Sequence, residues 1–133
     1  MRASSTARRF PPWIVAITVV LAWLGLVVHN IVEFPLMAFT RAEYCVPSLA
    51  WLVLFLAWLW FPNHHLSARL LLGWGAISLA GAILTVLPLP FLPFRPEQSL
   101  RHYGVHVLYA VTQLPVLRLT WRMRYSGRKE RAE

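Results

Sequence analysis

The feature that most constrains this chain is a series of long apolar runs, because a water-soluble domain would interrupt them with charged residues. The first run extends from Trp13 to Glu33 and carries no Lys, Arg or Asp. About 20 apolar residues are enough for a helix to cross the roughly 30 Å hydrocarbon core of a bilayer. The apolar part of a signal peptide usually has only about 7–15 residues, so we expect this run to stay in the membrane as a helix.

Three further runs follow, and together they predict an all-α fold, a four-transmembrane-helix bundle with both termini cytoplasmic. The chain is predicted to form a single integral membrane domain, residues 1–133, with spans at about 13–33, 46–61, 68–87 and 100–120 and a basic tail at 121–133. Four prolines in the segment 88–98 rule out a helix there. We expect that segment to lie extended at the interface, with Phe91 and Phe94 toward lipid.

Charge placement predicts the orientation. The chain has 13 Lys and Arg against five acids, a net charge of +8, but the cations lie mainly near its two ends instead of on a soluble basic face. This argues against a nucleic-acid partner. With the N-terminus inside, three cations lie outside (Arg41, Arg95 and Arg101) and ten lie inside: Arg2, Arg8, Arg9, Arg69, Arg118, Arg122, Arg124, Arg128, Lys129 and Arg131. The positive-inside rule therefore favours an even number of spans in the plasma membrane, or in bacteria the inner membrane.

Polar residues within the spans are the candidates for function, because ionisable groups are costly in a membrane. His29 and Glu33 are four residues apart on the first span and share a helical face. The last span carries a polar stripe at helical spacing: His102, His106, Tyr109 and Gln113. If the first and last spans are neighbours, three histidines and a glutamate should meet near the outer face. We take these six residues as a candidate ligand or proton site.

Several chemistries suit such a cluster. His29, Glu33, His102 and His106 could ligate zinc, iron or copper. His29 with His102 or His106 could hold a haem, by chemical analogy with four-helix membrane cytochromes. The cluster could also serve a quinone or a proton, with Glu33 and a histidine as the titrating pair. The structural alternative is that these side chains are solvated or tie helix ends together, with no cofactor bound.

The third span is rich in small residues, which allow close helix packing in lipid. Its small-x-x-x-small pairs are Ser78 with Ala82 and Ala76 with Ala80, so it is predicted to be a centre of packing and a possible site of self-association or contact with other membrane subunits. His64 and His65 precede it, in a predicted wetted turn with no further metal ligand nearby in the sequence.

The sequence contains no sign of catalysis. It has no Asp, no G-x-S-x-G nucleophile motif, no phosphate-binding glycine loop and a single cysteine, Cys45. We therefore expect a non-catalytic accessory or scaffold protein of a membrane complex. The alternatives are a metal-, haem- or quinone-binding membrane protein that uses the His/Glu cluster, and a small oligomeric transporter. In topology the chain resembles the small multidrug exporters, although their key acid lies in mid-membrane and Glu33 lies at the outer end.

Overall fold

The structure, a computed structural model, describes residues 10–35, 39–61, 64–93 and 95–129, apart from the side chains of His64 and of residues 125–129. These ranges contain four helices and no strand: α1 (Pro12–Glu33), α2 (Ala42–Trp60), α3 (His64–Leu84) and α4 (Leu100–Lys129). The all-α prediction is confirmed. Phe94 and the predicted inner cations Arg2, Arg8, Arg9 and Arg131 lie outside the described residues.

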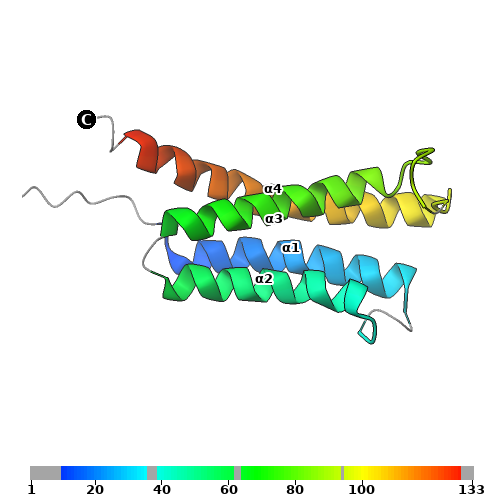
Figure 1. Cartoon of the computed structure of the whole chain (residues 1–133), viewed down its shortest axis with the longest axis horizontal. Coiled ribbons are helices and arrows are strands. Elements are labelled where there is room, and N and C mark those ends of the chain that lie inside the picture. The colour runs from blue at the N-terminus through cyan, green and yellow to red at the C-terminus, as the bar shows by residue number, and fades with distance from the viewer. Residues whose placement is uncertain (1–9, 36–38, 62–63, 94, 130–133) are drawn as a thin grey trace, which may run out of the picture.

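The helices lie side by side in an antiparallel bundle (Figure 1). Each packs against two others: α1 against α2 and α4, and α3 against α2 and α4. The C-terminal part of α4, orange to red in Figure 1, rises away from the other three helices. Three helices, α1, α2 and α3, are long and apolar enough to cross a membrane. α4 does not meet that criterion, because its polar stripe lowers its mean hydropathy.

Several helix ends differ from the predicted spans. α2 begins at Ala42, before the predicted residue 46, and Pro47 lies inside it. Glu43 in the first turn suits the positive end of the helix dipole, which explains the earlier start. α3 begins at His64, so His64 and His65 form its first turn and are not in the predicted loop.

The C-terminal ends of α3 and α4 also differ from the predicted ones. α3 ends at Leu84 and not at 87, and the Thr85 amide and hydroxyl both bond to the Gly81 carbonyl there. Pro88 and Pro90 follow and prevent a further turn. α4 continues to Lys129, beyond the predicted end at 120. Pro115 lies inside it, as the predicted span also had it, because a helix can lose one backbone bond at a proline and continue.

The buried side chains of the interior include both apolar and polar ones. Where α1 begins and α4 ends, the fully buried side chains include Val15, Leu71 and Val116. Toward the opposite end, the buried side chains on α4 are polar: His102, His106 and Gln113. The two small-x-x-x-small pairs of α3 differ in burial. Ser78 and Ala82 are buried, whereas Ala76 and Ala80 are exposed.

Candidate functional site

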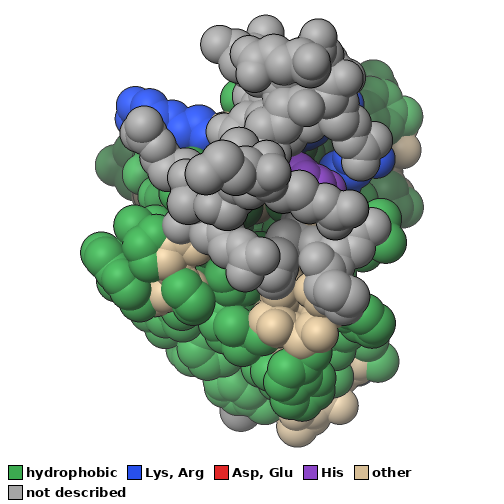
Figure 2. Space-filling model, turned by 90° about the vertical axis from the view of Figure 1, so that its left-hand side faces the viewer, with side chains coloured by type: hydrophobic (Ala, Val, Ile, Leu, Met, Phe, Trp, Pro, Cys, Tyr) green, Lys and Arg blue, Asp and Glu red, His purple; other side chains and the backbone are tan. Residues whose placement is uncertain are grey.

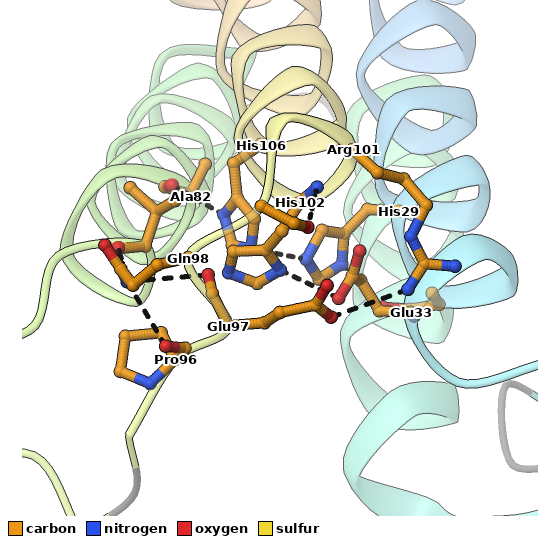
Figure 3. Close-up of polar contacts among 12 residues, drawn as sticks. His29, Glu33, Ala82, Pro96, Glu97, Gln98, Arg101, His102 and His106 are labelled. Atoms are coloured by element: carbon orange, nitrogen blue, oxygen red, sulfur yellow. Dashed lines mark hydrogen bonds and ion pairs between the residues drawn. The ribbon is translucent and has the colours of Figure 1, made fainter.

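The site lies where α1 ends and α4 begins. Glu33 is the last residue of α1, and His29 lies one turn earlier on the same face. His102 and His106 lie one turn apart on the first two turns of α4. The two helices run antiparallel, so the two pairs meet, and Figure 3 shows the four side chains pointing toward one another. We call these four residues the His/Glu cluster.

Direct contacts join the members of the cluster. His102 Nδ1 lies 2.8 Å from Glu33 Oε2, and His29 Nε2 lies 3.0 Å from His106 Nε2. The His102 and His106 rings are 4.4 Å apart between centroids. His106 Nδ1 donates to the Ala82 carbonyl of α3 over 2.8 Å. The cluster therefore links α1, α4 and α3 through polar contacts.

Two atoms of the cluster are buried without a hydrogen-bond partner. The side chains of Glu33 and His102 are 7% and 9% exposed. Glu33 Oε1 and His102 Nε2 nevertheless make no hydrogen bond within the described residues. A buried polar atom without a hydrogen-bond partner destabilises a fold by about 1–3 kcal/mol. These two atoms are therefore positions at which a further hydrogen-bond partner or a ligand would be stabilised.

The other two predicted site residues, Tyr109 and Gln113, continue the line of polar side chains from the cluster toward the middle of the bundle. We call this line along α4 the seam. The Tyr109 ring lies 5.3 Å from the His29 ring. Gln113 is fully buried and donates to the Ala22 carbonyl of α1 over 3.1 Å, while its Oε1 has no partner. All six predicted residues thus lie on one seam, but only the four cluster residues lie together at its end.

A close approach of α1 and α4 makes the seam possible. A Cβ atom at Gly25 would collide with the Thr112 side chain, so only glycine allows this separation of the helices. Gly25 was not among the predicted site residues, although an isolated glycine in a long apolar helix is a signal for close packing.

Sequence reasoning also missed Asn30 and two backbone carbonyls. Asn30 is 5% exposed, its Oδ1 lies 3.2 Å from His29 Nδ1, and its Nδ2 donates to the Tyr44 carbonyl over 3.4 Å. An amide inside an apolar run was a detectable signal. The Ala82 carbonyl, which accepts from His106, could not have been found from residue types.

An exposed ion pair lies at the loop end of the cluster, as Figure 3 shows. Arg101 is 3.5 Å from Glu97, and the Tyr103 hydroxyl donates a hydrogen bond to Gln98 Oε1. A hydrogen bond from Ser99, with the Arg101 guanidinium nearby, lowers the pKa of Glu97. This pair is solvated, unlike Glu33 and His102.

The geometry bears on the metal and haem hypotheses. Among the described residues, no three His, Cys, Asp or Glu side chains surround a common point suited to a metal ion. Metal–nitrogen bonds are about 2 Å long, so axial ligands on opposite sides of an iron would be about 4 Å apart. His29 Nε2 and His106 Nε2 are closer than that and in direct contact. A haem between them would require α1 and α4 to separate.

Comparison with known proteins gives no further guide to the site: no family model, no curated protein and no solved structure matches the chain.

Proposed function

We propose that this chain is a four-span membrane protein, with both termini cytoplasmic, that binds and releases a proton at the His/Glu cluster near its outer face. The observation that carries the proposal is the cluster itself: four ionisable side chains from two helices, in contact, inside an apolar bundle. Ionisable groups at membrane depth are costly and usually serve transport, relay or sensing.

The distribution of side chains on α4 supports a fourth span. Its buried residues include His102, His106 and Gln113, whereas Val107 and Val111 are 62% and 54% exposed. The polar stripe is therefore covered by α1 and α3, and the surface left for lipid is apolar. Average hydropathy understates such a helix, because it counts the covered face.

The charge distribution supports the orientation. The end of the bundle where α1 begins and α4 ends shows Lys or Arg side chains, and no acidic side chain is visible among the described atoms of that face (Figure 2). Among the described residues, six of the predicted inner cations belong to the parts of α3 and α4 at this end, against three at the other, which agrees with a cytoplasmic placement. In a Cys45→Ser background, labelling of single cysteines introduced near residues 40 and 97 should then occur only from outside, whereas labelling from inside would overturn the orientation.

A proton suits the cluster better than the other ligands considered. It needs no cavity and no three converging ligands, only titratable groups that can exchange it. Histidine exchanges a proton near physiological pH, and Glu33 supplies a buried counter-charge. The unpartnered Glu33 Oε1 and His102 Nε2 are positions at which a water would find hydrogen-bond partners.

Proton uptake tests the proposed function. Purified protein in bilayers is shifted from about pH 8 to about pH 5, the range in which histidine titrates, and bound protons are counted with an indicator dye. The double variant His29→Asn/His106→Asn should take up fewer protons than the wild type. Uptake equal to that of the wild type would refute a proton site. Elemental analysis of the same sample tests for a metal.

The accessory role predicted from the sequence is a second candidate, favoured by α2. Only 11% of its apolar stretch is buried within the chain, much less than for α1 or α3. A partner helix could cover the rest. Cross-linking from exposed positions such as Leu49 or Val53 in native membranes should then capture a discrete partner, and capture of lipid alone would argue against it.

A further inference from the structure

Two imidazole rings lie in a line of four polar groups whose hydrogens can be counted. From α3 to α1 the contacts are Ala82 carbonyl to His106 Nδ1 (2.8 Å), His106 Nε2 to His29 Nε2 (3.0 Å) and His29 Nδ1 to Asn30 Oδ1 (3.2 Å). Both outer members of the line, a carbonyl and an amide oxygen, can only accept a hydrogen bond. Every hydrogen in the three contacts must therefore come from the two imidazoles.

The count exceeds what two neutral rings carry. The first contact needs a hydrogen on His106 Nδ1, the last needs one on His29 Nδ1, and the central contact needs one between the two Nε2 atoms. A neutral imidazole carries one N–H, so two neutral rings supply two hydrogens for three contacts. The arrangement is satisfied only when the pair holds one proton more.

The orientation of Asn30 is essential to this count, and its second contact determines it. Asn30 Nδ2 faces the Tyr44 carbonyl at 3.4 Å. If the amide were turned over, its oxygen would face that carbonyl, and two acceptors would oppose each other. The oxygen of Asn30 therefore faces His29, as the count requires.

The surroundings suit a shared positive charge. Glu33, one turn from His29, is the buried carboxylate that balances it, and His102 holds that carboxylate through Nδ1. The Tyr109 ring lies 5.3 Å from His29, within the range of a cation–π contact. From α3 the neighbouring groups are uncharged, the Ala82 carbonyl and Ser78. From α2 the nearest contact is the Tyr44 carbonyl.

We infer that His29 and His106 share one excess proton, as a proton-bound imidazole pair that joins α1 to α4, with Glu33 as its counter-ion. This inference rests on the proposed proton site and specifies where the proton is held. It also predicts a window of pH. Loss of the proton leaves His29 Nδ1 and Asn30 Oδ1 as opposed acceptors, and gain of another places N–H groups on both Nε2 atoms. The contact between α1 and α4 is complete only between these limits.

The test is nitrogen NMR of the full chain in bilayers, with 15N-labelled histidine. In the wild type we expect scalar coupling between two imidazole nitrogens across one hydrogen bond, and two Nδ1 nitrogens that both carry hydrogen. His65→Gln should retain the coupling, whereas His106→Asn should lose it. Two neutral rings in the wild type, with one N–H each, would overturn the inference.

A second variant keeps the test valid if loss of a histidine disturbs folding. Asn30→Leu leaves both rings in place but removes the acceptor that requires the third hydrogen, so the pair should become neutral at a pH at which the wild-type pair is charged. An unchanged proton count in Asn30→Leu would also overturn the inference. Proton uptake with no coupled pair would refute the shared proton and leave the proposed function standing, while absence of uptake would refute both.

Discussion

In a water-soluble bundle the apolar faces of the helices are buried and the polar faces are exposed, whereas α2 and α4 show the reverse. α2 is almost entirely apolar, yet only two of its residues, Trp51 and Trp58, are buried. α4 carries a polar stripe, yet that stripe is buried, with Gln113 at 0% exposure. In lipid, apolar surface gains little by leaving the solvent, whereas polar groups gain partners. In this bundle the polar stripe of α4, more than the apolar surface of α2, therefore lies between helices.

The largest expected effect comes from removing the counter-charge of the seam. Glu33→Gln leaves the excess proton of the histidine pair unbalanced, and an unpaired buried charge costs about 3–5 kcal/mol. The free energy of unfolding should fall by an amount near this range at low pH. The deficit should shrink as the pH rises, because the pair then releases its proton.

Denaturant unfolding in mixed micelles at several pH values measures the effect of Glu33→Gln. Glu43→Gln is the matched control, since the Glu43 side chain is 59% exposed in the first turn of α2. Equal stability of Glu33→Gln and the wild type across the pH range would mean that the polar contacts of α4 carry no charge.

A smaller effect is expected from forcing α1 away from α4. Gly25→Val places a side chain where Thr112 lies, and overpacking of this kind costs about 1–3 kcal/mol. Gly73→Val on α3 is the control, because a Cβ atom there meets nothing within 4 Å. Thermal unfolding measures both, and Thr112→Ala should partly rescue Gly25→Val. If the two glycine variants were equally stable, close α1–α4 packing would not be what buries the stripe.

Gln113→Leu tests how much one buried polar side chain of the stripe contributes to the free energy of unfolding. The change removes hydrogen bonds to the Ala22 and Tyr109 carbonyls but also removes the buried Oε1 that has no partner. These effects oppose each other, and hydrogen bonds within membranes contribute only about 0.6 kcal/mol on average. The free energy of unfolding should therefore change by less than about 1 kcal/mol. A loss of several kcal/mol would show that the stripe holds the bundle together.

The smallest effect is expected on α2. Leu52 is 52% exposed, so Leu52→Ala should change the free energy of unfolding in bilayers by less than about 0.5 kcal/mol. Trp51→Ala, on the same helix but at a buried position, is the destabilising control. A large effect of Leu52→Ala would reveal a contact with another copy or partner and would weaken the contrast between the two helices.

The sequence by itself determined which stretches are helical and that the bundle is apolar, because span length and hydropathy are local properties. The run predicted from Trp13 to Glu33 agrees closely with α1, and helix is absent from the proline-rich stretch among its described residues. Helix ends were less accurate: α2 begins at Ala42 and not at 46, and α4 continues past 120 to Lys129, with Pro47 and Pro115 inside these helices. One lost backbone bond is too small a cost to end a helix that is supported by packing.

The sequence also determined the polar stripe of α4, because residues at steps of four, three and four share a helical face whatever they contact. Only the tertiary structure decided what that face meets. The pairing of His106 with His29, and of His102 with Glu33, follows from the packing of α1 against α4. The acceptors that complete the line, the Ala82 carbonyl and Asn30 Oδ1, come from helix positions and side-chain directions that no residue pattern encodes. The proton count depends on those acceptors, and so it became visible only once the helices were in place.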